Sequence, residues 1–193
     1  MEAALRIPAV MTVQEFLAWD APSGPPWQLL DGEPRAMAPA SRTHGRIQAR
    51  LSSLIDAHLS ASGGPCTVIT APGIVPRVRS DSNFRIPDLA VTCSDYQQEE
   101  STLTDPVLLV EILSPSNQAE TWTNIWAYTT IPSVQEILIV HSTAIRADLL
   151  RRDAEGNWPE QAVTIEDGPL TLRSIDFTTD LTALYRGTRL APA

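Results

Sequence analysis

Lysine is absent from this sequence of 193 residues, so all 14 of its basic residues are arginine. Acidic residues number 23, and the formal net charge is therefore −9. Such a charge argues against a protein that coats nucleic acid through its overall field, although a local basic patch is compatible with it. Long hydrophobic runs are also absent, since no segment approaches the roughly 18 consecutive apolar residues of a membrane helix. We therefore expect no membrane span.

Cysteine is scarce, and Cys66 and Cys93 do not have the CxxC spacing of a zinc site. Each lies in an apolar segment, a pattern more typical of small buried thiols than of a disulfide framework. An export signal is absent too, because the N-terminus has no basic region followed by an apolar one. We therefore assign the cysteines no role and expect a cytoplasmic protein.

The length and composition favour one globular domain. A chain of 193 residues, 43% of them apolar, can bury about 70% of its unfolded surface in one domain. No internal repeat, low-complexity segment or linker divides the chain. The predicted domain therefore spans residues 1–193.

Helical and strand-like segments are mixed along the chain. The clearest helix begins after Ser41, which can cap it, and ends at Gly63 and Gly64. The other predicted elements are helices over 12–20 and 118–130, a hairpin around 31–32, strand-rich runs over 66–80, 84–92, 107–113, 134–142 and 145–153, a strand pair near 161–173 and a final helical turn. This order predicts an α/β or α+β fold with one central sheet.

Two acidic residues lie on neighbouring strand-like runs. Asp88 is part of "RIPDLAV" and Glu111 is part of "VLLVEIL". Two carboxylates that converge at a strand edge are difficult to keep ionised together without a cation. Mg²⁺ characteristically takes one or two carboxylates, waters and phosphate oxygens, a combination suited to phosphodiester hydrolysis. The spacing alone fits a structural arrangement equally well, in which Asp88 caps a turn after Pro87 and Glu111 pairs with an arginine.

Five short motifs follow one another along the chain. They are "WQLLDGE", "APASRTHGRI", "RIPDLAV", "VEILSPSN" and "AETWTNIWAY". Together they resemble the PD-(D/E)xK nuclease superfamily and, more closely, the bacterial Uma-type restriction endonuclease family, over about residues 11–187. The resemblance implies a restriction-endonuclease-like fold, in which a mixed central sheet is flanked by helices and carries additional β-hairpins.

The resemblance also implies a metal site on the two strands. Asp88 and Glu111 would ligate Mg²⁺ or Mn²⁺, and the carbonyl of Ile112 would complete the inner sphere. One departure concerns the family's hairpin glutamate, because Gln28 takes its position. This replacement removes a negative charge from the surroundings of the metal.

A second departure lies on the helix that follows Glu111. Glu120, Asn124 and Tyr128 are spaced i, i+4, i+8 on one helical face and match the acid, lysine and tyrosine of the family. Asparagine therefore stands where the family has lysine. Its amide can hold a water by hydrogen bonding, but it carries no charge and cannot transfer a proton. Loss of general acid–base assistance lowers a rate by roughly 10²–10⁴-fold.

A histidine offers a replacement for the lost base. His44 lies in the first turn of the long helix, three residues before Ile47, and the family also has a histidine at this place. We interpret His44 as facing the site, where it would surround the attacking water together with Gln28, Asn124 and Tyr128. The alternative is a packed structural histidine.

Arginines are candidates for binding phosphate. Arg77 and Arg79 alternate on a predicted strand and Arg85 follows across a turn, so this cluster could bind a nucleic-acid backbone. Neutralisation of nearby acids explains the same pattern equally well. A second row, spaced i, i+4, i+8 on the long helix, is turned away from the apolar face and is interpreted as solvated surface. It consists of Arg42, Arg46 and Arg50.

The predicted function is metal-dependent cleavage of DNA, with an activity that the missing lysine impairs. The alternative is a catalytically inactive relative that keeps the nuclease fold to bind nucleic acid or a protein partner. The resemblance also implies a homodimer.

Overall fold

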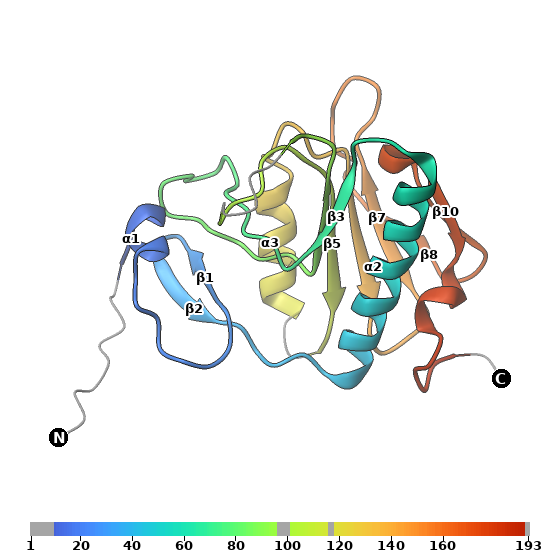
Figure 1. Cartoon of the computed structure of the whole chain (residues 1–193), viewed down its shortest axis with the longest axis horizontal. Coiled ribbons are helices and arrows are strands. Elements are labelled where there is room, and N and C mark those ends of the chain that lie inside the picture. Colours follow the sequence, from blue (N-terminus) through green and yellow to red (C-terminus); the bar gives the residue numbers. More distant parts are fainter. Residues whose placement is uncertain (1–9, 96–100, 116–117, 192–193) are drawn as a thin grey trace.

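Six strands form the central sheet of the computed structural model, which describes residues 10–95, 101–115 and 118–191 (Figure 1). In spatial order they are β3 (Thr67–Thr70), β4 (Leu89–Thr92), β5 (Pro106–Leu113), β6 (Glu136–His141), β7 (Ala147–Arg151) and β8 (Val163–Ile165). All neighbours pair antiparallel except β5 and β6, which are parallel and are connected through helix α3 (Gln118–Tyr128). The predicted mixed sheet with flanking helices is confirmed.

β5 lies inside the sheet because its side chains are apolar on both faces. Val110 and Ile112 pack into the core on one side, whereas Leu109 and Leu113 pack into the core on the other. Successive side chains of a strand point to opposite faces. Glu111 therefore shares the face of Leu109 and Leu113, which α3 covers, and its carboxylate is directed at that helix.

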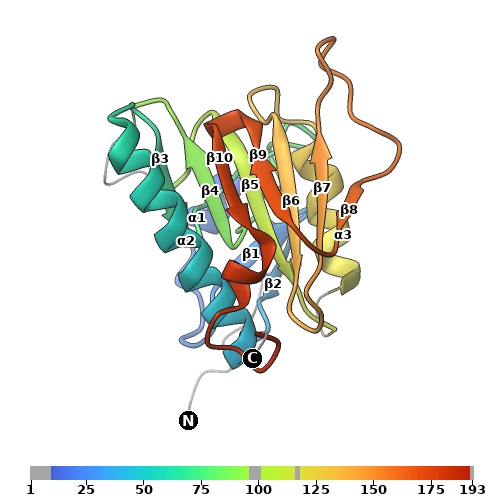
Figure 2. The same cartoon turned by 90° about the vertical axis from the view of Figure 1, so that its right-hand side faces the viewer.

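Two layers cover the sheet (Figure 2). One face carries helix α2 and two C-terminal strands, and the other carries α3. The elements of the first layer are α2 (Arg42–Ser62), β9 (Pro169–Leu172), β10 (Phe177–Asp180) and the 3₁₀ turns η1 (Arg173–Ile175) and η2 (Leu181–Tyr185). Between each layer and the sheet lies a core of buried aliphatic side chains, whose burial stabilises the fold by about 25 cal/mol per Å² of apolar surface.

α2 begins and ends where the sequence predicts. The hydroxyl of Ser41 accepts the backbone N–H of His44 at 3.2 Å, which is the contact of an N-cap. At the other end Gly63 has a φ of 65°, a left-handed conformation that glycine adopts without a steric penalty. Because the helix starts at Arg42, its first turn places His44 at the edge of the sheet.

A small N-terminal unit packs beside α3 (Figure 1). Its elements are α1 (Val13–Leu17), β1 (Trp27–Leu30) and β2 (Glu33–Ala36). β1 and β2 form the predicted hairpin around Asp31 and Gly32. Leu29 exchanges two backbone hydrogen bonds with Phe84, at 2.8 and 3.0 Å. These bonds fix the hairpin against the segment that leads into β4, and they bring Gln28 toward the acidic residues.

One predicted strand assignment is wrong, and one predicted strand pairing is not found among the described strands. Residues 71–80 do not continue β3, because they contain one isolated bridge at Ile74 followed by a turn in which Arg79 has a φ of 46°. Alternating apolar and basic residues imitate a strand here, whereas Pro72 and Pro76 lack the backbone N–H that a ladder needs. Two strands do form in the predicted pair near 161–173, but they do not pair with each other. Instead β8 extends the central sheet, and β9 pairs with β10.

The interpretation of Cys66 and Cys93 as separate thiols is wrong, because the two form a disulfide. The register of β3 and β4 pairs Thr67 with Thr92, so the adjoining cysteines stand opposite each other. Sequence periodicity does not show which residues of two strands are opposed. Disulfides persist mainly in oxidising compartments, so this bond runs against the expected cytoplasmic location, which stays a prediction.

In the part of the chain that the structure describes, no helix has both the length and the apolar character required to cross a membrane.

Candidate functional site

Asp88 and Glu111 stand opposite each other on neighbouring strands. The antiparallel register of β4 and β5 pairs Leu89 with Val110. Asp88 directly precedes β4 and Glu111 directly follows Val110, so continuing this register by one residue sets the two acids opposite each other. Both residues line a cavity of about 940 Å³. The structure thus brings together the two acids that the sequence places on adjacent strands.

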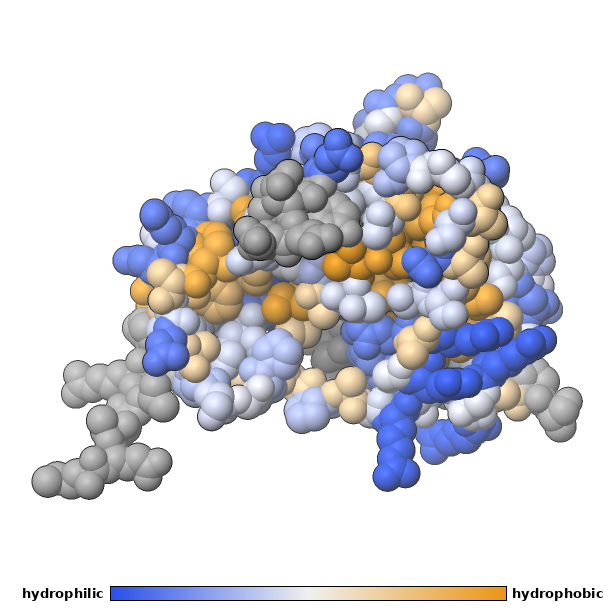
Figure 3. Space-filling view, in the orientation of Figure 1, coloured by the Kyte–Doolittle hydropathy of each residue, from blue (hydrophilic) through white to orange (hydrophobic). Residues whose placement is uncertain are grey.

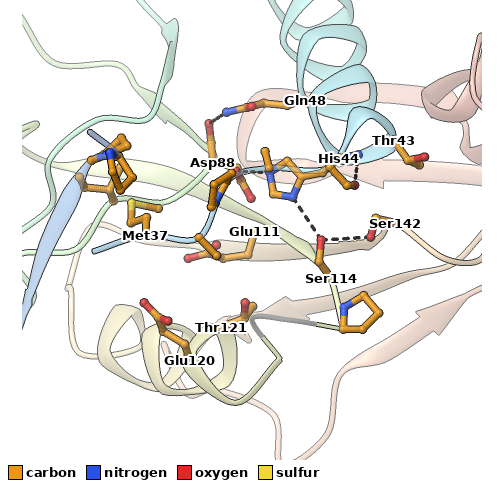
Figure 4. A pocket seen from close by; sticks show the side chains of 18 of the residues that line it. Met37, Thr43, His44, Gln48, Asp88, Glu111, Ser114, Glu120, Thr121 and Ser142 are labelled. Carbon is orange, nitrogen blue, oxygen red and sulfur yellow. Dashed lines mark hydrogen bonds and ion pairs between the residues drawn. The ribbon is translucent and has the colours of Figure 1, made fainter. Parts of the chain in front are cut away.

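Both carboxylate oxygens of Asp88 have protein partners. Oδ1 lies 2.7 Å from Nε2 of His44, and Oδ2 accepts the backbone N–H of Ile112 at 2.6 Å. Because a carboxylate has no hydrogen to donate, Nε2 of His44 is the donor in this contact. The backbone carbonyl of Asp88 accepts the side-chain amide of Gln48 at 2.9 Å (Figure 4). Each carboxylate oxygen keeps a second lone pair for a further ligand.

Glu111 is held from α3. Its Oε1 accepts the hydroxyl of Tyr128 at 2.9 Å and the side-chain amide of Asn124 at 3.4 Å. The amide oxygen of Asn124 accepts Nη1 of Arg85 at 2.9 Å, and Arg85 also donates to Asn83 at 2.7 Å. All of these side chains are buried. A buried arginine is therefore linked to Glu111 through the amide that stands at the family's lysine position.

Burial and the charge of Asp88 raise the pKa of Glu111 well above its ordinary value of 4.5. The hydrogen bonds from Tyr128 and Asn124 lower this pKa, but burial outweighs them. Burial and the proximity of Glu111 also raise the pKa of the Tyr128 hydroxyl, which therefore keeps its proton and remains a donor. An ionised carboxylate in this place is unfavourable without a cation nearby.

This raised pKa makes the stability of the metal-free protein depend on pH. A folded-state pKa above the unfolded value means that the folded protein holds a proton which the unfolded chain releases. The resulting stabilisation is complete below pH 4.5 and is lost as the pH rises through the folded pKa of Glu111. In EDTA we expect the free energy of unfolding of Glu111→Gln not to fall with rising pH in this way. At neutral pH this variant should therefore be more stable than wild type. Urea unfolding at a series of pH values measures both quantities.

The control for the change in net charge is Glu160→Gln, because Glu160 is exposed. Its pH profile should parallel that of wild type. If the profile of Glu111→Gln also parallels wild type, Glu111 is not the buried ionisable group that the structure shows.

Gln28 and Glu120 connect the hairpin to α3. The side-chain amide of Gln28 donates to Oε1 of Glu120. Gln28 is only 1% exposed, yet its Oε1 has no hydrogen-bond partner among the described residues. An unsatisfied buried acceptor costs roughly 1–3 kcal/mol. A water or a cation in the cavity would satisfy this oxygen.

Acidic side chains line the bottom of the cavity, and apolar side chains form much of its walls. His44 and Gln48 reach Asp88 from α2, while Glu120 and Thr121 lie on α3 at the other side (Figure 4). The larger apolar wall residues are Pro25, Pro26, Met37, Pro39, Ile86 and Pro115. Apolar surroundings strengthen electrostatic interactions at the carboxylates because they lower the local dielectric constant.

The oxygen atoms at the cavity fit a hard divalent cation. Among the described residues, no group of three or more His, Cys, Asp or Glu side chains is arranged to hold a metal ion. Mg²⁺ requires fewer protein ligands, because it keeps several waters and takes one or two carboxylates together with phosphate oxygens. Asp88, Glu111 and Oε1 of Gln28 are hard donors of this kind. The expected role of the Ile112 carbonyl stays a prediction, since the contact in the structure is made by the Ile112 N–H.

The structure does not bring Arg77, Arg79 and Arg85 together at the cavity. Arg79 pairs with Asp31 at 2.9 Å, and the backbone N–H of Arg77 donates to Thr130 just beyond the C-terminal end of α3. Arg85 is only 3% exposed and points at Asn124 instead of solvent. The expected strand that would align the three is absent, because residues 77–80 form a turn.

Several polar contacts at the site were not expected from the sequence. Gln48 lies one turn after His44 on α2, so the i, i+4 spacing was an available signal. Ser114 follows β5, and its hydroxyl lies 3.4 Å from Nδ1 of His44 and 3.2 Å from the hydroxyl of Ser142. Ser142 follows β6. The parallel pairing of β5 with β6 brings these two strand ends together, and no sequence pattern shows that pairing.

Known proteins share both the sequence pattern and the fold of this chain. The Uma2 family model, described as "Putative restriction endonuclease", matches residues 13–183. An "Uncharacterized protein slr1290" of Synechocystis sp. is 32% identical over 180 residues, which cover 92% of each chain. A crystal structure of a "putative nuclease belonging to DUF820" from Anabaena variabilis has a TM-score of 0.73 and 18% identity, over 91% of this chain and 97% of that one. The resemblance and the nuclease-like fold predicted from the motifs are confirmed.

Proposed function

Since this chain belongs to the Uma2 family, we propose that it is a divalent-metal-dependent endonuclease that hydrolyses DNA phosphodiester bonds in the cavity of Asp88 and Glu111. The observation that carries the proposal is the convergence of half-buried Asp88 and buried Glu111 on one cavity, where a cation would relieve the repulsion between the two carboxylates. The proposal includes a homodimer as the assembly that the family resemblance implies.

Asp88, Glu111 and the amide oxygen of Gln28 would hold Mg²⁺ or Mn²⁺. When bound, such an ion supplies positive charge to the scissile phosphate and lowers the pKa of a water. The protein contributes fixed positions for its ligands. Asp88 is oriented by His44 and Ile112, and Glu111 is oriented by Tyr128, so neither carboxylate must reorganise when the substrate arrives.

Hydrolysis requires that the water oxygen form a new bond to phosphorus and that one backbone P–O bond break. The water proton must be accepted, and the departing sugar oxygen must take up a proton, which solvent can supply. In this structure Nε2 of His44 donates to Asp88, so Nδ1 is the nitrogen that can take up a proton. The hydroxyl of Ser114 lies 3.4 Å from Nδ1. His44 is thus a positioning residue for Asp88 and a proton acceptor only through Nδ1.

Asn124 and Arg85 take over part of the role of the missing lysine. The amide of Asn124 can hold a water next to Glu111, and Arg85 fixes the orientation of this amide by donating to its oxygen. The arginine keeps its charge, because guanidinium does not deprotonate in proteins. It thereby places a positive charge near the site, although it offers no proton to the reaction.

A second candidate function is a catalytically inactive nuclease fold that binds nucleic acid or a protein partner. The observation that favours it is Asn124, because an amide cannot transfer the proton that lysine would. Both candidates keep the metal site, so cleavage and metal binding must be measured separately.

The test is the nicking of supercoiled plasmid by wild-type protein. We expect nicking with Mg²⁺ or Mn²⁺ and none in EDTA. Thermal unfolding with and without each ion is the companion measurement, because an ion that binds only the folded state raises the melting temperature. A raised melting temperature without nicking would favour the inactive candidate. If neither response is seen, the metal site itself is refuted.

A further inference from the structure

Five arginines gather on one side of the cavity, where α2 meets the C-terminal segment. We call this surface the arginine face, and it consists of Arg42, Arg46, Arg50, Arg186 and Arg189. All are exposed except Arg50, which is half-buried. In the space-filling view, hydrophilic side chains cover this region (Figure 3). The face therefore holds 5 of the 14 cationic side chains of a chain whose net charge is −9.

The C-terminal segment completes a row that starts on the helix. Nε of Arg46 donates to the carbonyl of Arg186 at 3.1 Å, and Nε of Arg50 donates to the carbonyl of Ala183 at 3.3 Å. These bonds dock the segment after η2 onto α2. The solvated helical row that the sequence predicts is therefore part of a larger cationic surface, built from two segments far apart in the chain.

Acids are scarce in the two segments that build the arginine face, and the nearest one in the C-terminal segment is Asp180, whose pKa the charge of Arg186 helps to lower. Neither 34–55 nor 181–193 contains an Asp or Glu. Among the described residues, none of the five arginines forms an ion pair, whereas four arginines elsewhere do. These four are Arg35, Arg79, Arg146 and Arg151. Within the described part of the chain, the five guanidinium groups are thus not held in ion pairs, and positive charge predominates on this face.

The arginine face continues into the acidic cavity. Arg42 and Arg189 line the same cavity as Asp88 and Glu111. Arg42 is the first residue of α2, whose backbone N–H groups add positive potential at that end of the helix. A polyanionic chain bound on the arginine face would therefore extend into the cavity that contains the two carboxylates.

We propose that the arginine face binds the phosphate backbone of the nucleic-acid strand that enters the cavity, an inference that rests on the proposed nuclease function. From Arg42 to Arg50 the helix rises about 12 Å, a distance that spans roughly three or four phosphates of one strand. Guanidinium groups bind phosphate oxygens in bidentate fashion and release counterions from the nucleic acid. The arginine face attracts the nucleic acid, whereas the negative charge on the rest of the protein repels it.

Binding of a fluorescein-labelled DNA duplex and of the matching single strand, measured by anisotropy in EDTA across a salt series, tests the proposal without cleavage. Arg42→Gln/Arg189→Gln removes two charges from the arginine face at residues that donate no hydrogen bond among the described residues. We expect about tenfold or greater loss of affinity and a salt slope reduced in magnitude by about two.

The matched control is Arg77→Gln/Arg79→Gln, which removes two charges from the turn near the other end of α3. We expect it to change affinity and salt slope far less. Equal losses in both double variants, or a wild type that binds neither DNA, would overturn the proposal. Thermal unfolding verifies that both variants are folded.

Plasmid nicking distinguishes a failure of this inference from a failure of the proposed nuclease function. If wild type nicks plasmid while Arg42→Gln/Arg189→Gln binds and nicks as wild type does, only the arginine face is refuted. If wild type binds DNA through the face but does not nick, the inference stands and the nuclease proposal fails.

Discussion

Replacing Asp88 with alanine is expected to lower metal-dependent nicking of plasmid by about 10³-fold or more. The variant removes one of two carboxylates available to the cation, and metal-ion stabilisation of a transition state amounts to several kcal/mol, at about 1.4 kcal/mol per factor of ten. It also removes the partner of His44 and the acceptor for the Ile112 N–H. The rise in melting temperature with Mg²⁺ or Mn²⁺ should disappear together with nicking.

Two companion variants make this result interpretable. Asp88→Asn keeps an acceptor oxygen for the Ile112 N–H while removing the charge, so it should fold better than Asp88→Ala and still fail to nick. Asp56→Ala removes an exposed acid from α2 and should behave as wild type. Nicking by Asp88→Ala at the wild-type rate would mean that cleavage, if present, occurs elsewhere.

Combining Asn124→Lys with Arg85→Gln is expected to raise the nicking rate about 10²-fold over wild type. Lysine at 124 would lie beside Glu111, where it could bind the attacking water and move a proton. The single variant Asn124→Lys is expected to be destabilised, because it removes the oxygen to which Arg85 donates at 2.9 Å and places a second cation beside it. Arg85→Gln relieves this repulsion and still offers an amide donor to Asn83.

The four proteins of this double-mutant cycle are wild type, the two single variants and the double variant. Urea unfolding should show a coupling of about 1–3 kcal/mol between the two positions, and single-turnover nicking gives the rates. Additive stabilities would mean that Arg85 and Asn124 do not interact. A folded double variant with no gain in rate would show that residue 124 does not hold the reacting water.

The pairing of Asp88 with Glu111 could be anticipated because two local patterns agree. Glu111 interrupts the apolar strand β5 and Asp88 directly precedes the apolar strand β4, and the side-chain period of a strand fixes the face on which each acid appears. The helix pattern is equally strict, since Glu120, Asn124 and Tyr128 at four-residue spacing had to share one side. The resemblance to the family then indicated which acids share a site. Neither the strand period nor the helix period gives this information.

What could not be anticipated depends on contacts between segments. Arg85 lies on a strand-like run that suggested a surface residue, and only the packing of α3 against it explains its burial beneath Asn124. The arginine face depends in the same way on the docking of the C-terminal segment against α2. The turn at Arg79 was missed because an alternating pattern was given more weight than Pro72 and Pro76.

The bond between Cys66 and Cys93 gives part of the chain the topology of a closed loop. Residues 66–93 form a covalent ring, and both Asp88 and the exposed turn at 77–80 belong to it. Exposed turns are where proteases cut most readily. A single cut in this turn would open the ring without separating the two fragments. The fragment that carries Asp88 would stay linked to the N-terminal fragment until the disulfide is reduced.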